Sequence, residues 1–508
     1  MPGRLDLDGT TGLPSLKLED DRRVVVIGTG PAGAAAAWEL HRAGIAVTVL
    51  EAGSRRSARG VTVRSPGLTL FRRKRPLPVP LVSRVAEDTP PVCWSVELSA
   101  GGLSNHWTCA VPRFSPEDFT DGERLDPKYR WPVSYRELVE NYASMERLLQ
   151  IGGSGLDVAN LPGGEVSHRV RLADDWQPVV EQAGARGHGL TSLPLAYAGG
   201  WTITRSGTQF NSFVRLLESL PPTTRFRVFF GAQALRLEWS GERKRVTRVI
   251  FRDASSGTEG SVTGTAFVVA AGALNSTRLL LESNCPEFPR GLGNTDGVLG
   301  RYLHDHPLAR LGLRLQRPLS IHPPAYLTRA PYAAAPPLRA VAGTLWSGTW
   351  LRLKKLLTRG KSDEIGFNLM GTIPPLETNG VALNPSHRDP TGGATLDLRV
   401  RFDDDTGVML DRARERLLEI LDAAGFRASV NHWLVEQIGV SVHYGGTVRM
   451  HLSPRYGMLD AWNRLHAVPN VLVVDSSAFT TGPEKNPTLT AMALASRAAQ
   501  RLARELRF

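Results

Sequence analysis

Hydrophobic positions near the start of the chain form two short runs that flank a helical stretch. The β-branched run Val24–Ile27 suits a strand buried on both faces, and residues 46–51 form a second apolar run. An alanine-rich stretch between them begins after Gly33 and ends near Gly44, a residue that commonly terminates helices. The pattern therefore predicts a strand–helix–strand unit over residues 24–51.

The turn after the first strand carries the spacing Gly28-x-Gly30-x-x-Gly33. Gly28 permits the tight turn, Gly30 lets the backbone approach a pyrophosphate, and Gly33 lets helix and strand pack closely. The positive N-terminal end of the helix favours the phosphate, and Glu51 follows the second strand, where it can bind ribose hydroxyls. An ordinary glycine turn is the alternative. We predict a dinucleotide site, although this motif alone does not distinguish FAD from NAD.

The remaining periodicity predicts an α/β protein with a Rossmann-type sheet. A helix should begin after Ser134, which forms a capping box with Glu137, and a long amphipathic helix should cover residues 405–424. Short strands over residues 226–270 and a helix over 274–282 indicate a return to the nucleotide sheet. The expected division is a lead-in at 1–22, a discontinuous nucleotide-binding domain at 23–307 with substrate-domain insertions, a substrate-binding domain at 308–440, and a returning nucleotide-domain segment at 441–508.

Composition narrows the class of protein. With 508 residues, 42% of them hydrophobic and 22% charged, the chain suits two closely joined globular domains. The net charge of +12 comes from scattered arginines and matches no nucleic-acid module, so we expect no nucleic-acid partner. Three cysteines suit a reducing compartment, and residues 1–22 lack the apolar core of a signal peptide. These features predict a cytoplasmic protein.

Two other patterns have competing interpretations. His304 and His306 flank Asp305 and could bind a metal from an extended segment, but no third ligand has a convincing place, so we expect no metal. Residues 345–361 could form a basic amphipathic helix on an anionic membrane or a helix docked on its own domain. We favour docking and predict no stable membrane anchor.

Four later segments identify a family. They are residues 104–114, 442–450, 472–477 and 486–492, which read SNHWTCAVPRF, VHYGGTVRM, LVVDSS and NPTLTAM. With the glycine turn, these segments make the chain resemble the glucose–methanol–choline (GMC) family of FAD oxidoreductases along nearly its whole length. Residues 104–114 are similar to the flavin-attachment segment of pyranose oxidases, which places the resemblance closest to pyranose oxidases and bacterial glycoside oxidases.

The resemblance implies FAD rather than NAD, a discontinuous flavin-binding domain and a substrate domain built on a sheet. It implies that FAD is attached covalently to His106 and that Thr108 lies beside the reactive part of the flavin. The complete set of residues expected to bind FAD is Gly28, Gly30, Gly33, Glu51, Gly102, Asn105, His106, Trp107, Thr108, Cys109, Ala271, Asp475, Pro487 and Thr488.

The same resemblance assigns the catalytic pair. His443 matches the family's base, and a neutral imidazole suits that task because its reference pKa of about 6.5 lies near operating pH. Asn486 matches the partner residue, whose amide can hold the substrate oxygen but cannot take its proton.

These residues lead to an expected reaction. It is FAD-dependent oxidation of a secondary hydroxyl, at C2 or C3 of a pyranose or glycoside, with oxygen or a quinone as acceptor. The alternative is a biosynthetic oxidation of an aminosugar or glycosylated natural product, for which Glu364 and Glu377 are candidate acids around a cationic substrate. A catalytically silent flavin-binding module would instead predict degraded catalytic positions, whereas His443 and Asn486 are both present.

Overall fold

The computed structural model describes most of the chain. The described residues are 23–55, 82–85, 94, 96–105, 107–196, 212, 216–217, 220, 225–329, 341–345, 360–389 and 392–507. The lead-in at 1–22, His106 and residues 346–359 of the basic stretch lie outside them. The predictions made for those parts therefore remain predictions.

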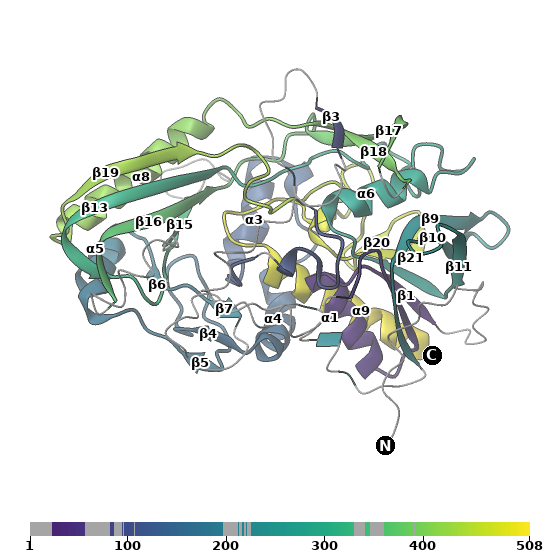
Figure 1. Cartoon of the computed structure of the whole chain (residues 1–508), viewed down its shortest axis with the longest axis horizontal. Coiled ribbons are helices and arrows are strands. Elements are labelled where there is room, and N and C mark those ends of the chain that lie inside the picture. Colours follow the sequence, from purple (N-terminus) through teal and green to yellow (C-terminus); the bar gives the residue numbers. More distant parts are fainter. Residues whose placement is uncertain are drawn as a thin grey trace.

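A six-stranded sheet forms the centre of the nucleotide-binding side (Figure 1). All neighbouring pairs run parallel except the edge pair β20–β21. The β1 side chains are at most 4% exposed, as expected for a strand covered on both faces. The predicted Rossmann-type sheet is confirmed. Its strands, in spatial order, are β20 (Arg464–Leu465), β21 (Val468–Val473), β12 (Ala266–Val269), β1 (Val24–Ile27), β2 (Val47–Glu51) and β8 (Phe226–Phe230).

Helices from both ends of the chain pack together beside this sheet. Helix α1 (Pro31–Arg42) contacts the C-terminal helix α9 (Thr488–Arg507), which in turn contacts α4 (Tyr135–Leu149). The α1 residues 34–37 are alanines with no exposed surface, and their small size allows close packing. Ser496 of α9 donates a 2.7 Å hydrogen bond to the Glu39 carboxylate of α1. The N- and C-terminal segments thus build one domain.

A second six-stranded sheet, to the left in Figure 1, supports the expected substrate side. Helices α5 (Gln177–Ala185) and α8 (Thr406–Ala423) pack with it around a separate apolar core. That core includes Val179, Leu311, Leu313, Phe367, Leu417 and Leu421. All of its strand pairs are antiparallel, and their spatial order is β19 (Ala428–Val435), β13 (Leu308–Ser320), β16 (Lys361–Gly371), β15 (Val341–Leu345), β14 (Ala325–Leu327) and β6 (Leu190–Ser192).

A hairpin of two strands packs beside a helix on the flavin side of the molecule. The strands β17 (Gly380–Arg388) and β18 (Ala394–Arg399) pack against helix α6 (Ala273–Glu282) through an apolar cluster that includes Leu274, Val381 and Leu396. Residues 308–440 therefore contain both most of the large antiparallel sheet and a hairpin on the flavin side. The other elements are β3 (Val82–Val85), β4 (Ile151–Gly153), β5 (His168–Arg169), β7 (Leu195–Ala196), β9 (Ala232–Ser240), β10 (Arg245–Asp253), β11 (Glu259–Thr263) and α3 (Pro116–Leu125).

Candidate flavin and catalytic site

The first turn shows why two of its glycines are required. Gly28 has φ +101°, and a Cβ atom there would lie 2.4 Å from the Ala270 carbonyl oxygen. A Cβ on Gly33 would lie 2.3 Å from the Gly28 carbonyl oxygen, so this residue sets the close approach of α1 to the strand. Gly30 differs, because a Cβ there would meet no atom within 4 Å. Gly30 therefore borders open space of the kind that a pyrophosphate needs.

Glu51 lies at the end of β2, beside this turn. Its carboxylate accepts hydrogen bonds from the Thr29 amide at 3.1 Å, the Thr29 hydroxyl at 2.5 Å and the Gly53 amide at 2.9 Å. Burial raises the pKa of Glu51, and these hydrogen bonds oppose that shift. The Thr29 hydroxyl also accepts from the Gly101 amide at 2.9 Å. Glu51 is thereby linked to the second predicted flavin segment.

The 101–109 segment lies against the first glycine turn. A Cβ on Gly102 would sit 3.7 Å from the Gly30 Cα, so the two turns face each other. The Asn105 amide donates to the Ser99 hydroxyl at 3.1 Å and to the Ala100 and Gly102 carbonyls at 3.1 and 2.8 Å. Asn105 therefore stabilises the turn itself. Beyond it, Trp107 is half-buried, Thr108 is exposed and Cys109 is buried with φ +65°.

Asp475 joins the turns that follow β12 and β21. Its buried carboxylate accepts from the Gly272 and Ser477 amides, each at 3.0 Å, and from the hydroxyls of Ser276 and Ser477. The Ala271 amide donates to the same Ser276 hydroxyl at 3.0 Å. These turns and the Gly28 turn all follow parallel strands, so they share the edge of the sheet where ligands of this fold bind.

His443 and Asn486 meet although 43 residues separate them. The Asn486 Nδ2 atom lies 3.2 Å from His443 Nε2. An amide nitrogen can only donate, so this contact makes Nε2 the acceptor of a neutral imidazole. Burial lowers the pKa of His443 to about 4, which favours the same neutral form. Within the described residues, His443 Nδ1 and Asn486 Oδ1 have no hydrogen-bond partner.

Backbone contacts place this pair beside the flavin edge of the sheet. The Ser476 hydroxyl donates to the Tyr444 carbonyl at 2.5 Å, and the Val448 amide donates to the Ser477 carbonyl at 2.9 Å. The turn after His443 therefore packs on the turn that contains Asp475. The structure brings together both predicted catalytic residues and the described turns predicted to bind the flavin.

The segment from His304 to His306 supports the catalytic turn. Asp305 accepts from the backbone amides of His443 at 2.9 Å and Gly439 at 2.8 Å, and burial raises its pKa to about 6. The His306 ring packs edge-to-face on the His443 ring, with their centroids 4.8 Å apart. Sequence reasoning treated these residues only as possible metal ligands, and the local sequence carries no signal of contacts made more than 130 positions away. No group of three or more potential metal ligands occurs among the residues that the structure describes.

The two acids considered for a cationic substrate have arginine partners. Glu364 pairs with Arg314 at 2.8 Å, and Glu377 pairs with Arg301 at 2.7 Å. All four side chains are substantially exposed. Neither acid is thus available as an unpaired charge, and the aminosugar alternative gains no support from them.

Two protein family models match this chain. A family model described as FAD dependent oxidoreductase matches residues 23–326, which is more than half of the chain. The chain therefore belongs to the FAD-dependent oxidoreductases. A second model, described as GMC oxidoreductase, matches residues 375–495 and covers both His443 and Asn486. This match confirms the GMC resemblance, and with it FAD as the cofactor.

Curated relatives align with this chain along most of its length. It is 26% identical to 2-methyl-1,2-propanediol dehydrogenase of Mycolicibacterium austroafricanum, with 96% of each chain covered. It is 28% identical to paromamine 6'-oxidase of Streptomyces fradiae, covering 96% of this chain and 93% of the relative. It is 26% identical to C-glycoside 3-oxidase of Microbacterium trichothecenolyticum, covering 83% and 78%, respectively. All three names describe oxidoreductases.

The helices can be compared with the requirements for spanning a membrane. Among the helices in the described part of the chain, none combines the length and apolar character needed to cross a bilayer.

Proposed function

We propose that this chain oxidises a hydroxyl group of a sugar, with His443 as the general base and Asn486 holding the substrate oxygen. The observation that supports this assignment most strongly is the His443–Asn486 contact of 3.2 Å between two side chains that each keep a buried, unpartnered polar atom among the described residues. Buried polar atoms without partners are rare, and at a family's catalytic position they suit a ligand.

We propose that the turns at the carboxyl edge of the sheet hold FAD, which when bound supplies a hydride acceptor. The open space at Gly30 and the start of α1 suit the pyrophosphate, and the Glu51 carboxylate suits the ribose hydroxyls. The other proposed contacts come from Gly28, Gly33, Gly102, Asn105, His106, Trp107, Thr108, Cys109, Ala271, Asp475, Pro487 and Thr488.

The catalytic pair would act on the substrate hydroxyl. When the substrate binds, its hydroxyl replaces the Asn486 amide as the donor to the neutral His443 Nε2, which then accepts the hydroxyl proton. The Asn486 amide donates to the substrate oxygen instead and cannot take its proton. Asp305 accepts a 2.9 Å hydrogen bond from the His443 backbone amide and so holds the backbone of the base in place.

The names of two of the three relatives support a sugar as substrate. C-glycoside 3-oxidase supports the expected oxidation of a ring secondary hydroxyl at C2 or C3, and paromamine 6'-oxidase supports the aminosugar alternative. We favour a pyranose or glycoside because both candidate acids for a cationic substrate are paired with arginine. Oxygen or a quinone is the proposed acceptor, and the low cysteine count supports a cytoplasmic location.

A substrate screen tests this proposal. Free pyranoses, C-glycosides, aminosugars and 2-methyl-1,2-propanediol are mixed anaerobically with the FAD-loaded protein, and bleaching of the flavin is followed. His443→Ala provides the control for substrate-independent bleaching. The expected result is rapid reduction by a sugar, with a ketone at C2 or C3 identified by nuclear magnetic resonance. Reduction by the propanediol and by none of the sugars would refute the proposed substrate class.

A further inference from the structure

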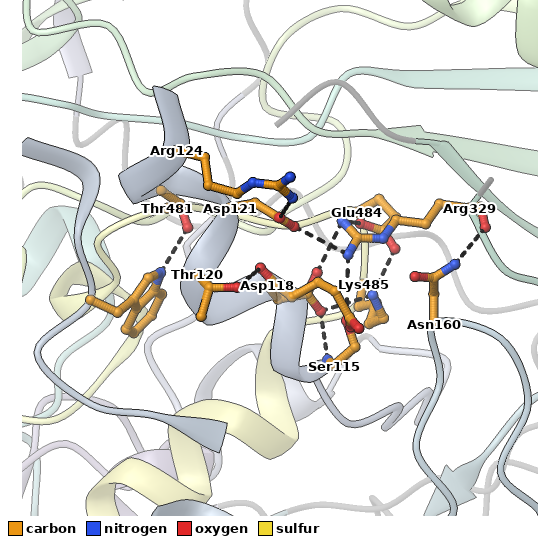
Figure 2. A network of polar contacts seen from close by, with 12 residues as sticks. Ser115, Asp118, Thr120, Asp121, Arg124, Asn160, Arg329, Thr481, Glu484 and Lys485 are labelled. Atoms are coloured by element: carbon orange, nitrogen blue, oxygen red, sulfur yellow. Dashed lines mark hydrogen bonds and ion pairs between the residues drawn. The ribbon is translucent and has the colours of Figure 1, made fainter. Parts of the chain in front are cut away.

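The turn that carries Asn486 is anchored by a buried group of charges, which we call the Lys485 cluster: Lys485, Glu484, Asp118, Asp121 and Arg329. The Lys485 ammonium lies 2.8 Å from the Asp118 carboxylate and 2.7 Å from the Glu484 carboxylate. The side chains of these three residues have no exposed surface. The Arg329 guanidinium lies 3.2 Å from Asp118 and 3.4 Å from Asp121. Figure 2 shows these side chains converging.

The cluster joins three parts of the molecule that are distant in sequence. Asp118 belongs to α3, where its carboxylate also accepts from the Ser115 amide at 2.6 Å and caps the helix. Arg329 follows β14 of the large antiparallel sheet, and its carbonyl accepts from the Asn160 amide at 3.1 Å. Lys485 belongs to the catalytic turn. A buried ammonium is costly unless its carboxylate partners are in place, so these contacts restrict the position of the turn.

Asn486 is constrained on both sides. Lys485 precedes it and is fixed by the cluster, while Pro487 follows it and restricts the Asn486 backbone to extended conformations. Burial is the main cause of the lowered pKa of His306, the residue that packs on His443, and the charge of Lys485 contributes to it as well. The cluster therefore lies close enough to the catalytic pair to affect it.

We propose that Lys485 is a positioning residue whose buried ion pairs hold the Asn486 amide against His443 and couple this geometry to the substrate sheet through Arg329. The inference rests on the proposed function for the roles of His443 and Asn486. It does not depend on which alcohol is oxidised.

Charge balance provides a specific test. Three carboxylates face two cations in the Lys485 cluster. Lys485→Met leaves the three carboxylates facing Arg329 and, at Asp121, the largely exposed Arg124 at 3.4 Å, and their repulsion should displace the turn. Lys485→Met/Glu484→Gln leaves two carboxylates facing one cation within the cluster, which restores the original net charge without restoring the ammonium. If charge balance positions Asn486, the second change should recover part of what the first one loses.

The measurement is the rate of anaerobic flavin reduction at saturating alcohol, with FAD content and melting temperature recorded for each variant. Lys485→Met should reduce the flavin about a hundredfold more slowly, the loss expected for a displacement of roughly 1 Å at a reacting group. The double variant should reduce its flavin at least about tenfold faster than Lys485→Met does. A merely stabilising role of Lys485 would not produce this gain in rate. The control is Arg416→Met, which breaks the exposed 2.9 Å pair with Glu419 and should leave the rate unchanged.

Crystal structures of the variants provide a readout that needs no substrate. The Asn486–His443 contact should stay near 3.2 Å in the wild type and lengthen in Lys485→Met. An unchanged contact together with an unchanged reduction rate would overturn the inference, and so would a double variant no faster than the single one. If Lys485→Met does not bind FAD, Asp118→Asn serves instead, and normal reduction by that variant would also overturn it. Failure of the sugar assignment would appear separately, as a wild-type protein that oxidises only other alcohols.

Discussion

The substitutions Gly30→Ala and Gly33→Ala should have different effects: the first should weaken FAD binding, and the second should lower the stability of the fold. A Cβ on Gly30 meets no atom within 4 Å, and the Gly30 backbone, with φ −59° and ψ 173°, is accessible to alanine. Such a substitution stabilises a protein by about 0.4–1 kcal/mol through the unfolded state. A Cβ on Gly33 would lie 2.3 Å from the Gly28 carbonyl oxygen, so the backbone must move. Overpacking of this kind costs about 1–3 kcal/mol.

The two variants should therefore differ by about 1.4–4 kcal/mol in the free energy of unfolding of the FAD-free protein. Urea unfolding measures this difference, and a fluorescence titration measures the affinity for FAD. Both glycine variants carry the additional change His106→Ala, which removes the predicted covalent link to the flavin, and the parent for comparison is His106→Ala alone.

Gly30→Ala should be about 0.4–1 kcal/mol more stable than the parent but bind FAD at least about tenfold more weakly, because its methyl group occupies the space proposed for the pyrophosphate. Gly33→Ala should lose stability before any FAD is added. A Gly30→Ala protein with the parent's FAD affinity would refute the proposed path of the pyrophosphate.

Three further outcomes are expected. With the pKa of His443 lowered to about 4, roughly nine-tenths of the imidazole is neutral at pH about 5, against about 3% for an unperturbed histidine. Flavin reduction should therefore stay nearly constant from pH about 5 to 8 in Asp305→Asn, which removes the neighbouring carboxyl whose pKa is raised to about 6. A rate that falls about tenfold per unit below pH about 6.5 in stopped-flow measurements would contradict this. Acid precipitation should leave the flavin in the protein pellet, with a flavin-modified peptide containing His106, and full release of FAD into the supernatant would exclude the covalent link. Reduced enzyme should be reoxidised at a rate that increases with oxygen concentration, and a rate independent of oxygen would indicate a dehydrogenase.

Local pattern was sufficient to predict several elements on both the nucleotide-binding side and the substrate side. The predicted strand Val24–Ile27 has its expected bounds, and the helix expected over residues 405–424 is α8 (Thr406–Ala423). The capping box predicted at Ser134 is present, with the Ser134 amide donating to Glu137 at 2.8 Å. These features depend on side chains within a few positions of one another, so their signal is contained in the local sequence.

The supporting structure around the catalytic pair could not be predicted in this way. Lys485 and Asp118 form an ion pair across 367 positions, and nothing nearby in the sequence indicates that either charge is buried. Asp305 was noted only as the residue between two possible metal ligands, whereas it accepts from the backbone of a turn more than 130 residues away. Sequence identified His443 and Asn486 through a motif, but what holds them in place depends on tertiary contacts.

The measurement that tests the central claim most directly is the rate of flavin reduction in His443→Ala and Asn486→Ala, each loaded with FAD and mixed anaerobically with its best alcohol substrate. Both variants should bind FAD as the wild type does. Loss of the general base in His443→Ala should slow reduction by about 10² to 10⁴, and Asn486→Ala should also impair reduction more than FAD binding. FAD-loaded variants that both reduce their flavin at close to the wild-type rate would contradict the assignment of this pair.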